Sequence, residues 1–244
     1  MQEMLMIKKR IRKKRRRRRI IITLALTITI LIVSWLPIFK IARIDVKGTA
    51  DGQIIGYTNS LQNKNIWWHS LSSIEKHLTD FPTIKTAIVK RHFPNILEID
   101  LKERQKTAFA FVANKFVIIS EDGKVLEVAD SASANLIEIK GLKSTNIKIG
   151  ESFTEIGTDR YNKYICIISN FSDYGFLQGI KYIDLSANST AIIKYNNSII
   201  DFGKADLAES KMKLLNEIIK TSSKDTKAEI DVSNGKKAYY KETY

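Results

Sequence analysis

A run of twenty uncharged residues near the N-terminus constrains this chain more than any other feature. From Ile20 to Phe39 the sequence reads IIITLALTITILIVSWLPIF, with no Asp, Glu, Lys or Arg. A helix of that length, rising about 1.5 Å per residue, extends about 30 Å, the thickness of the hydrocarbon core of a bilayer. We therefore predict a single transmembrane helix over residues 20–39, with Pro37 marking the end of its regular part.

A cleaved signal peptide and a buried globular helix are the alternatives for this segment. The apolar run is longer than the ~7–15 residues of a signal-peptide core. No small-x-small cleavage site follows it, since the next residues are Lys40, Ile41, Ala42 and Arg43. A buried globular helix is disfavoured, because the basic residues are concentrated on the N-terminal side of the apolar run. A retained anchor is therefore favoured over both.

The positive charge of the chain is concentrated just before the apolar run. Residues 1–19 hold eleven of the 40 Lys and Arg residues and one acid, a net charge of +10. The other 225 residues carry 29 basic and 25 acidic groups, which leaves only +4. The positive-inside bias places the N-terminus in the cytoplasm and residues 40–244 outside. The residues that set this topology are Arg15, Arg16, Arg17, Arg18 and Arg19.

A total net charge of +14 would by itself suggest a nucleic-acid binder. RNA binding by residues 8–19 is the alternative for the basic tail, but membrane topology explains the same residues. We expect the tail to lie against anionic lipid headgroups, and we predict no nucleic-acid partner.

Residue types that carry chemistry are scarce in this chain. The single cysteine, Cys166, excludes an intrachain disulfide and Cys-rich zinc sites. His69, His77 and His92 have no metal-ligand spacing, and no glycine-rich phosphate loop is present. Asp184 or Asp201 could join a serine in a catalytic triad, but the sequence has no Gly-x-Ser-x-Gly elbow to present the serine nucleophile. We therefore predict no catalytic residue, no cofactor, no metal and no small-molecule substrate.

Residues 40–104 predict a small α+β domain. Arg43–Lys47 alternates like a strand, Ile54, Tyr57 and Leu61 have helical spacing, and a second helix starts near residues 70–72 with a capping box from Ser72 to Glu75. Two strands follow, residues 86–93 and 97–101. The expected order is β-α-α-β-β. For the aromatic pair Trp67 and Trp68, packing between the helices is favoured over a partner-contact or membrane-facing role.

Residues 105–240 predict a mixed β domain with helices. Residues 116–128 form a hairpin around Asp122-Gly123, which suits a type I′ turn. Helices are expected near residues 159–171 and from a capping box at Asp206–Glu209. Strands are expected over residues 136–139, 180–185, 191–195 and 198–202. A final hairpin turns at Asn234-Gly235, between residues 228–233 and 236–240, and residues 241–244 are a short tail.

Several motifs in this order resemble the bacterial cell-division family FtsQ/DivIB. They are the basic tip with one anchor, IARIDVKG, the run LSSIEKHLTDFPTIKTAIVKRHFPNILEIDLKERQKTAFAF, VIISEDGKVLEV, SIIDFG, LAESKMKLLNEIIK and EIDVSNGKKAYYK. The most specific part joins Ile84–Arg104 to the Asp122-Gly123 hairpin. The resemblance covers most of residues 40–240, whereas residues 129–158 are not distinctive.

The resemblance implies a non-enzymatic scaffold of the divisome, with an external POTRA domain followed by a β domain. Family members join FtsB-like and FtsL-like proteins and help coordinate septal peptidoglycan synthesis at the division septum. The family's partner-pairing β segment corresponds here to residues 228–240. Its candidate contacts are Ile230, Val232, Tyr239 and Tyr240, although filling the core remains an equal reading for Ile230 and Val232.

Two other functions are weighed against the scaffold. A membrane-anchored cell-wall hydrolase or protease would need a catalytic constellation, and none is recognisable in the sequence. A POTRA protein of outer-membrane or secretion assembly would need a long β-barrel, for which about 140 residues after the POTRA segment are too few.

Overall fold

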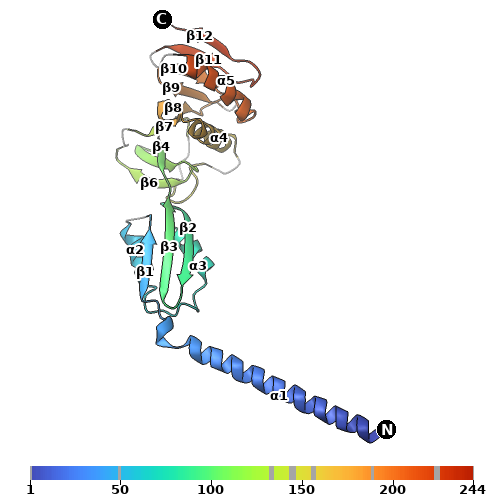
Figure 1. The fold of residues 1–244 in the computed structure, drawn as a ribbon. Coiled ribbons are helices and arrows are strands. Elements are labelled where there is room, and N and C mark those ends of the chain that lie inside the picture. Colours follow the sequence, from blue (N-terminus) through green and yellow to red (C-terminus); the bar gives the residue numbers. More distant parts are fainter. Residues whose placement is uncertain are drawn as a thin grey trace. The chain divides into compact units, whose positions relative to one another are not determined.

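The computed structural model describes residues 2–48, 51–131, 135–142, 147–154, 158–187, 190–222 and 226–243, with backbone only for residues 2–15. The chain forms two compact units (Figure 1). Unit 1 comprises the residues up to Thr79 together with Thr86–Lys102, and unit 2 comprises Asp80–Lys85 and Glu103–Tyr244.

The N-terminal helix α1 runs from Gln2 to Ser34, and a 3-10 turn, η1, follows over Pro37–Phe39. The regular helix therefore ends just before Pro37, as the proline predicted, and the last residues of the predicted segment 20–39 form η1. Leu36, which precedes Pro37, is extended with ψ 143°, because proline disfavours the helical region for the residue before it. Among the described residues, none of the helices combines the length and the apolar character needed to cross a membrane.

Unit 1 has the predicted β-α-α-β-β order. Its elements are β1 (Arg43–Lys47), α2 (Gly52–Asn59), α3 (Leu71–Thr79), β2 (Ile84–His92) and β3 (Ile96–Glu103). The three strands form a sheet in the order β1-β3-β2, with β1 parallel to β3. Along β3, Leu97, Ile99 and Leu101 are buried while Asp100 is exposed, which confirms the predicted alternation.

The predicted capping box of the second helix in unit 1 is wrong. The helix begins at Leu71, so Ser72 already lies in its first turn. The Ser70 hydroxyl instead accepts a hydrogen bond from the Ser73 N–H at 3.4 Å. The carboxylate of Glu75 accepts from the Val89 N–H at 2.9 Å, so this side chain ties α3 to β2.

Unit 2 is built on a nine-stranded mixed sheet with the order β12-β11-β10-β9-β8-β7-β4-β5-β6 (Figure 1). Three neighbouring pairs are parallel, namely β4 with β7, β7 with β8, and β10 with β11. The strands are β4 (Lys106–Val112), β5 (Lys115–Ser120), β6 (Val125–Ala129), β7 (Ile137–Lys140), β8 (Ile180–Asp184), β9 (Ile192–Tyr195), β10 (Ser198–Asp201), β11 (Ala228–Asp231) and β12 (Tyr239–Glu242).

Two helices cover one face of this sheet, α4 (Asp159–Asp173) and α5 (Ala208–Thr221), with the 3-10 turn η2 (Leu177–Gly179) after α4 (Figure 1). Apolar side chains of both helices pack with the inward side chains of the strands. This core includes Tyr164, Phe171, Met212, Leu215, Ile183, Ile193 and Ile200. The α+β class and the mixed β sheet predicted from the sequence are confirmed.

The predicted capping box at Asp206–Glu209 is also wrong. The residue that precedes α5 is Leu207, with a left-handed φ of 50° and no side-chain cap. The Asp206 carboxylate instead accepts from the Lys211 ammonium at 3.0 Å. The Lys211 side chain is fully buried, and a buried cation needs a counter-charge more than a helix end needs a cap.

The two predicted hairpins form, but both turns differ from expectation. Gly123 has a positive φ of 77° whereas Asp122 does not, so the β5–β6 loop is not a type I′ turn. The Gly123 N–H donates to Ser120, as in a type I turn followed by a left-handed glycine. In the last hairpin β12 begins only at Tyr239, because Asn234 and Gly235 form a wider turn in which the Asn234 side chain accepts from two backbone N–H groups.

Candidate partner-binding edge

Strand β12 is the last strand of the sheet in unit 2, so its outer side is unpaired among the described residues (Figure 1). Its inner side pairs antiparallel with β11. The Thr243 N–H donates to the Lys227 carbonyl at 2.9 Å, so these two residues form a hydrogen-bonded pair. Because hydrogen-bonded and non-hydrogen-bonded pairs alternate, the N–H and C=O groups of Tyr240 and Glu242 point outward. An added strand would bond to these groups.

The opposite edge of the sheet, at β6, is partly covered. The Val125 N–H donates to the Glu151 carbonyl at 2.9 Å, and the Gly150 N–H donates to the Val125 carbonyl at 2.8 Å. An isolated bridge between Lys124 and Ser152 extends this contact. Because the chain itself occupies the start of the β6 edge, β12 is the more open edge for a second polypeptide.

The four residues predicted to contact a partner fall into two groups. Ile230 and Val232 are buried and belong to the core of unit 2. Tyr239 and Tyr240 are 62% and 40% exposed on the edge strand. Tyr240 lies opposite Ile230 and Tyr239 opposite Asp231, so the two tyrosines flank the strand on opposite faces of the sheet.

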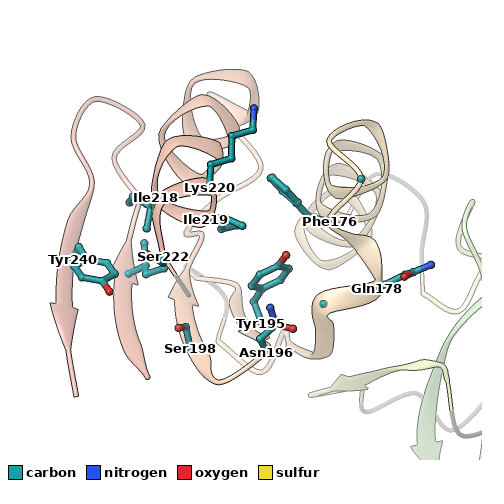
Figure 2. A pocket seen from close by; sticks show the side chains of 13 residues that line it. Phe176, Gln178, Tyr195, Asn196, Ser198, Ile218, Ile219, Lys220, Ser222 and Tyr240 are labelled. Carbon is teal, nitrogen blue, oxygen red and sulfur yellow. The ribbon is translucent and has the colours of Figure 1, made fainter. Parts of the chain in front are cut away.

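An open pocket of about 530 Å³ adjoins Tyr240 on the helix-covered face (Figure 2). Figure 2 shows Ile218 and Ser222 between the Tyr240 ring and Tyr195, with Phe176 on the far wall. A second hollow, of about 490 Å³, lies on the other face of the edge. Its lining comes from strands β10, β11 and β12, namely Ile199, Asp201, Glu229, Ile230, Asp231, Tyr239, Tyr240 and Lys241. A strand added beside β12 would therefore meet a hollow on each face.

The wall of the first pocket is fixed by Tyr195. Its ring packs against Phe176 with ring centroids 6.2 Å apart at 72°. Burial raises the pKa of the Tyr195 hydroxyl, so the ring stays neutral. A Cβ atom at Gly179 would lie 2.3 Å from a carbon of the Tyr195 ring, so only glycine leaves room for it.

The residues predicted to set topology lie in α1. Arg16, Arg17, Arg18 and Arg19 are exposed, whereas the side chain of Arg15 lies outside the described residues. The apolar side chains after them are exposed as well, among them Ile21, Ile32 and Trp35.

Cys166, Asp184 and Asp201, the residues considered for catalysis from the sequence, each contact a backbone group. Burial is the largest influence on Cys166 and raises the pKa of its thiol, which points to the Ala205 carbonyl. The carboxylates of Asp184 and Asp201 accept from the backbone N–H groups of Ser186 and Gly203, so both close local turns. Within the described ranges, no group of three or more His, Cys, Asp and Glu residues is placed to hold a metal ion.

Glu242 and the pocket beside the edge are two functional features that the sequence does not predict. The predicted hairpin ends at Tyr240 and leaves residues 241–244 as a tail, whereas β12 continues to Glu242. The alternation Tyr240–Lys241–Glu242 was too short to signal a strand. The pocket combines residues from the η2 region, α5 and strands β9 to β12, and no single stretch of sequence carries that pattern.

Comparison with known proteins finds relatives along most of the chain. A family model described as "POTRA domain, FtsQ-type" matches residues 39–104. The chain is similar to the cell division protein DivIB of Clostridium acetobutylicum, with 32% identity over 207 residues that cover 81% of each chain. It is 28% identical to a DivIB of Clostridium botulinum over 98% of this chain and 95% of the relative. The cell division protein FtsQ of Corynebacterium glutamicum is 22% identical, over 48% of this chain and 54% of its own.

Proposed function

Because the chain belongs to the FtsQ/DivIB family of cell-division proteins, we propose that it is a membrane-held scaffold of the bacterial divisome that captures a partner strand at β12. Family members are non-enzymatic division proteins, so the chain is not an enzyme. The observation that carries the proposal is the open β12 edge, whose outward backbone groups belong to Tyr240 and Glu242.

Strand addition at this edge has two physical sources of affinity. The outward N–H and C=O groups supply main-chain hydrogen bonds, and alternate side chains of the incoming strand reach the two hollows beside β12. The exposed tyrosines add large, rigid contact surfaces of the kind that dominates binding energy at interfaces. The partners we propose are the FtsB-like and FtsL-like proteins of the divisome.

The N-terminal segment supports a membrane location for the scaffold. Ile20–Phe39 has no charged residue, and its large apolar side chains are exposed. A contiguous exposed apolar surface of this kind is covered by a membrane or a partner in the functional state. The basic residues before it favour a cytoplasmic N-terminus, with residues 40–244 outside at the division septum. There the scaffold would help coordinate septal peptidoglycan synthesis.

Depletion of the protein in its own cells tests the division role. We expect septation to stop and the cells to grow as filaments or chains. Re-expression of the wild-type chain should restore septa. Normal division after a clean deletion would contradict the proposal.

The substitution Tyr240→Asp tests the edge. Replacing the aromatic ring by a carboxylate removes a large contact surface at the edge and should weaken partner capture by about 2 kcal/mol, roughly 30-fold in affinity. The measurement is recovery of FtsB-like and FtsL-like proteins from cross-linked cells.

A matched control for Tyr240→Asp is Val128→Asp on β6, at the opposite edge of the same sheet. The two side chains are exposed to the same degree, 40% for Tyr240 and 42% for Val128. Equal losses from both variants would argue for a general surface effect and against a site at β12.

A further inference from the structure

Five aromatic side chains gather at one end of unit 1, where the apolar segment ends. Trp35 packs edge-on against Trp68 with ring centroids 5.9 Å apart, and Phe39 packs against Trp67 at 5.8 Å. Trp67 also lies over Phe93 at 4.5 Å. Even so, Trp67 and Trp68 remain 49% and 60% exposed. The packing role favoured by the sequence therefore accounts for their contacts but not for their exposure.

Backbone hydrogen bonds hold the segments that carry these rings together. The Ile41 N–H donates to the Lys64 carbonyl at 2.9 Å, and the Ala42 N–H donates to the Asn95 carbonyl at 2.9 Å. The side-chain amide of Asn65 donates to the Ser34 carbonyl at 2.7 Å. The aromatic residues are therefore presented by a folded frame rather than by a loose loop.

The same end of unit 1 is positively charged. Residues 34–43, 62–69 and 90–97 contain no Asp or Glu and five basic residues, namely Lys40, Arg43, Lys64, Lys90 and Arg91. Arg43 pairs with Asp45 at 3.1 Å, and the other four form no ion pair within the described part of the chain.

The pKa of His69 is sensitive to these positive charges. Burial, and then the charges of Lys64 and Arg91, lower the pKa of its imidazole. An Nη atom of Arg91 donates to the His69 carbonyl, while its Nε is buried without a hydrogen-bond partner in the described residues. No acidic group contributes to the shift at His69.

We propose that this aromatic–basic surface (Trp67, Trp68, Phe93, Lys40 and Lys64) lies in the headgroup layer of an anionic membrane. Tryptophan rings prefer the membrane–water interface, and cations near it attract anionic lipids. The surface is continuous with the apolar segment through the Trp35–Trp68 and Phe39–Trp67 contacts. This inference rests on the proposed membrane anchoring, and a protein partner on the same surface is the competing outcome.

Tryptophan fluorescence of the full chain in vesicles tests the proposal. The variant Trp35→Phe leaves Trp67 and Trp68 as the only reporters, because the chain has three tryptophans. In vesicles of phosphatidylcholine and phosphatidylglycerol with brominated acyl chains, we expect a blue-shifted emission and loss of most of its intensity. The double variant Lys40→Glu, Lys64→Glu should restore much of that intensity.

A tryptophan elsewhere in unit 1 provides the control. Ile55 is exposed on α2, so Ile55→Trp with the three native tryptophans changed to Phe should keep its emission. A chain that does not float with the vesicles would contradict membrane anchoring itself. A chain that floats while Trp67 and Trp68 are quenched only by aqueous acrylamide would overturn the present inference and would favour a protein partner at this surface.

Discussion

Replacing Glu242 by proline is expected to weaken partner capture strongly while the chain stays folded. The Glu242 N–H points away from β11, so proline removes no bond of the existing sheet and is tolerated at such an edge position. It removes one of the outward donors, and its ring stands where an incoming carbonyl would bond. We expect a loss of about 2 kcal/mol or more, roughly 30-fold in affinity. The measurement is titration of the full chain with the FtsB-like partner.

Glu242→Ala is the matched control, because it removes the same side chain and keeps the N–H. We expect it to bind the partner nearly as tightly as the wild type. Lys241→Pro should instead destabilise the β11–β12 hairpin, because the Lys241 N–H faces β11 and proline removes it. Equal binding by Glu242→Pro and Glu242→Ala would rule out strand addition at this edge.

Replacing Arg104 by alanine is expected to cause the largest loss of stability of any substitution considered. Its side chain is only 6% exposed and donates to the Asp122 carboxylate at 2.9 Å. It also donates to the carbonyls of Pro82 and Ile84. Removing the cation takes away all of these hydrogen bonds and the counter-charge of Asp122, and should cost about 3 kcal/mol. The melting temperature of unit 2 should fall by about 6–12 °C.

The acid dependence of this loss identifies its cause. Burial alone would raise the pKa of Asp122, but hydrogen bonds from Ser120 and Arg104 outweigh it and lower the pKa. A lowered pKa stabilises the fold above the ordinary carboxyl range, and the stabilisation is lost as the pH falls through the folded value. In the Arg104→Ala variant, the melting temperature should therefore fall less steeply with decreasing pH than in the wild type.

The control for Arg104→Ala is Lys106→Ala, which removes an exposed ion pair with Glu127 in the same unit. Such a pair contributes about 0–1 kcal/mol. A similar fall in melting temperature for both variants would show that Arg104 has no special structural role.

Local patterns predicted the elements of the fold well. The alternation of residues 97–101 predicted β3, and the helical spacing of Tyr164, Ile168 and Phe171 predicted α4, because each pattern reflects burial on one face. The family resemblance read from the motifs is confirmed by relatives along most of the chain.

The two wrong capping-box predictions share one physical cause, which is competition for polar side chains by groups outside the helix end. Glu75 bonds the backbone of β2 and Asp206 bonds buried Lys211, so neither takes part in a capping box. The end of the N-terminal helix just before Pro37 follows from the proline in the sequence. The pocket beside Tyr240 could not be predicted, because it exists only where several segments far apart in the sequence meet.

Amide hydrogen exchange along β12 tests the central claim most directly. In the free chain the inward N–H groups of Tyr239 and Lys241 bond to β11, whereas those of Tyr240 and Glu242 face outward. On adding the FtsB-like partner, we expect the outward amides of Tyr240 and Glu242 to exchange slowly. Bound partner with unchanged exchange at these two amides would contradict strand addition at β12.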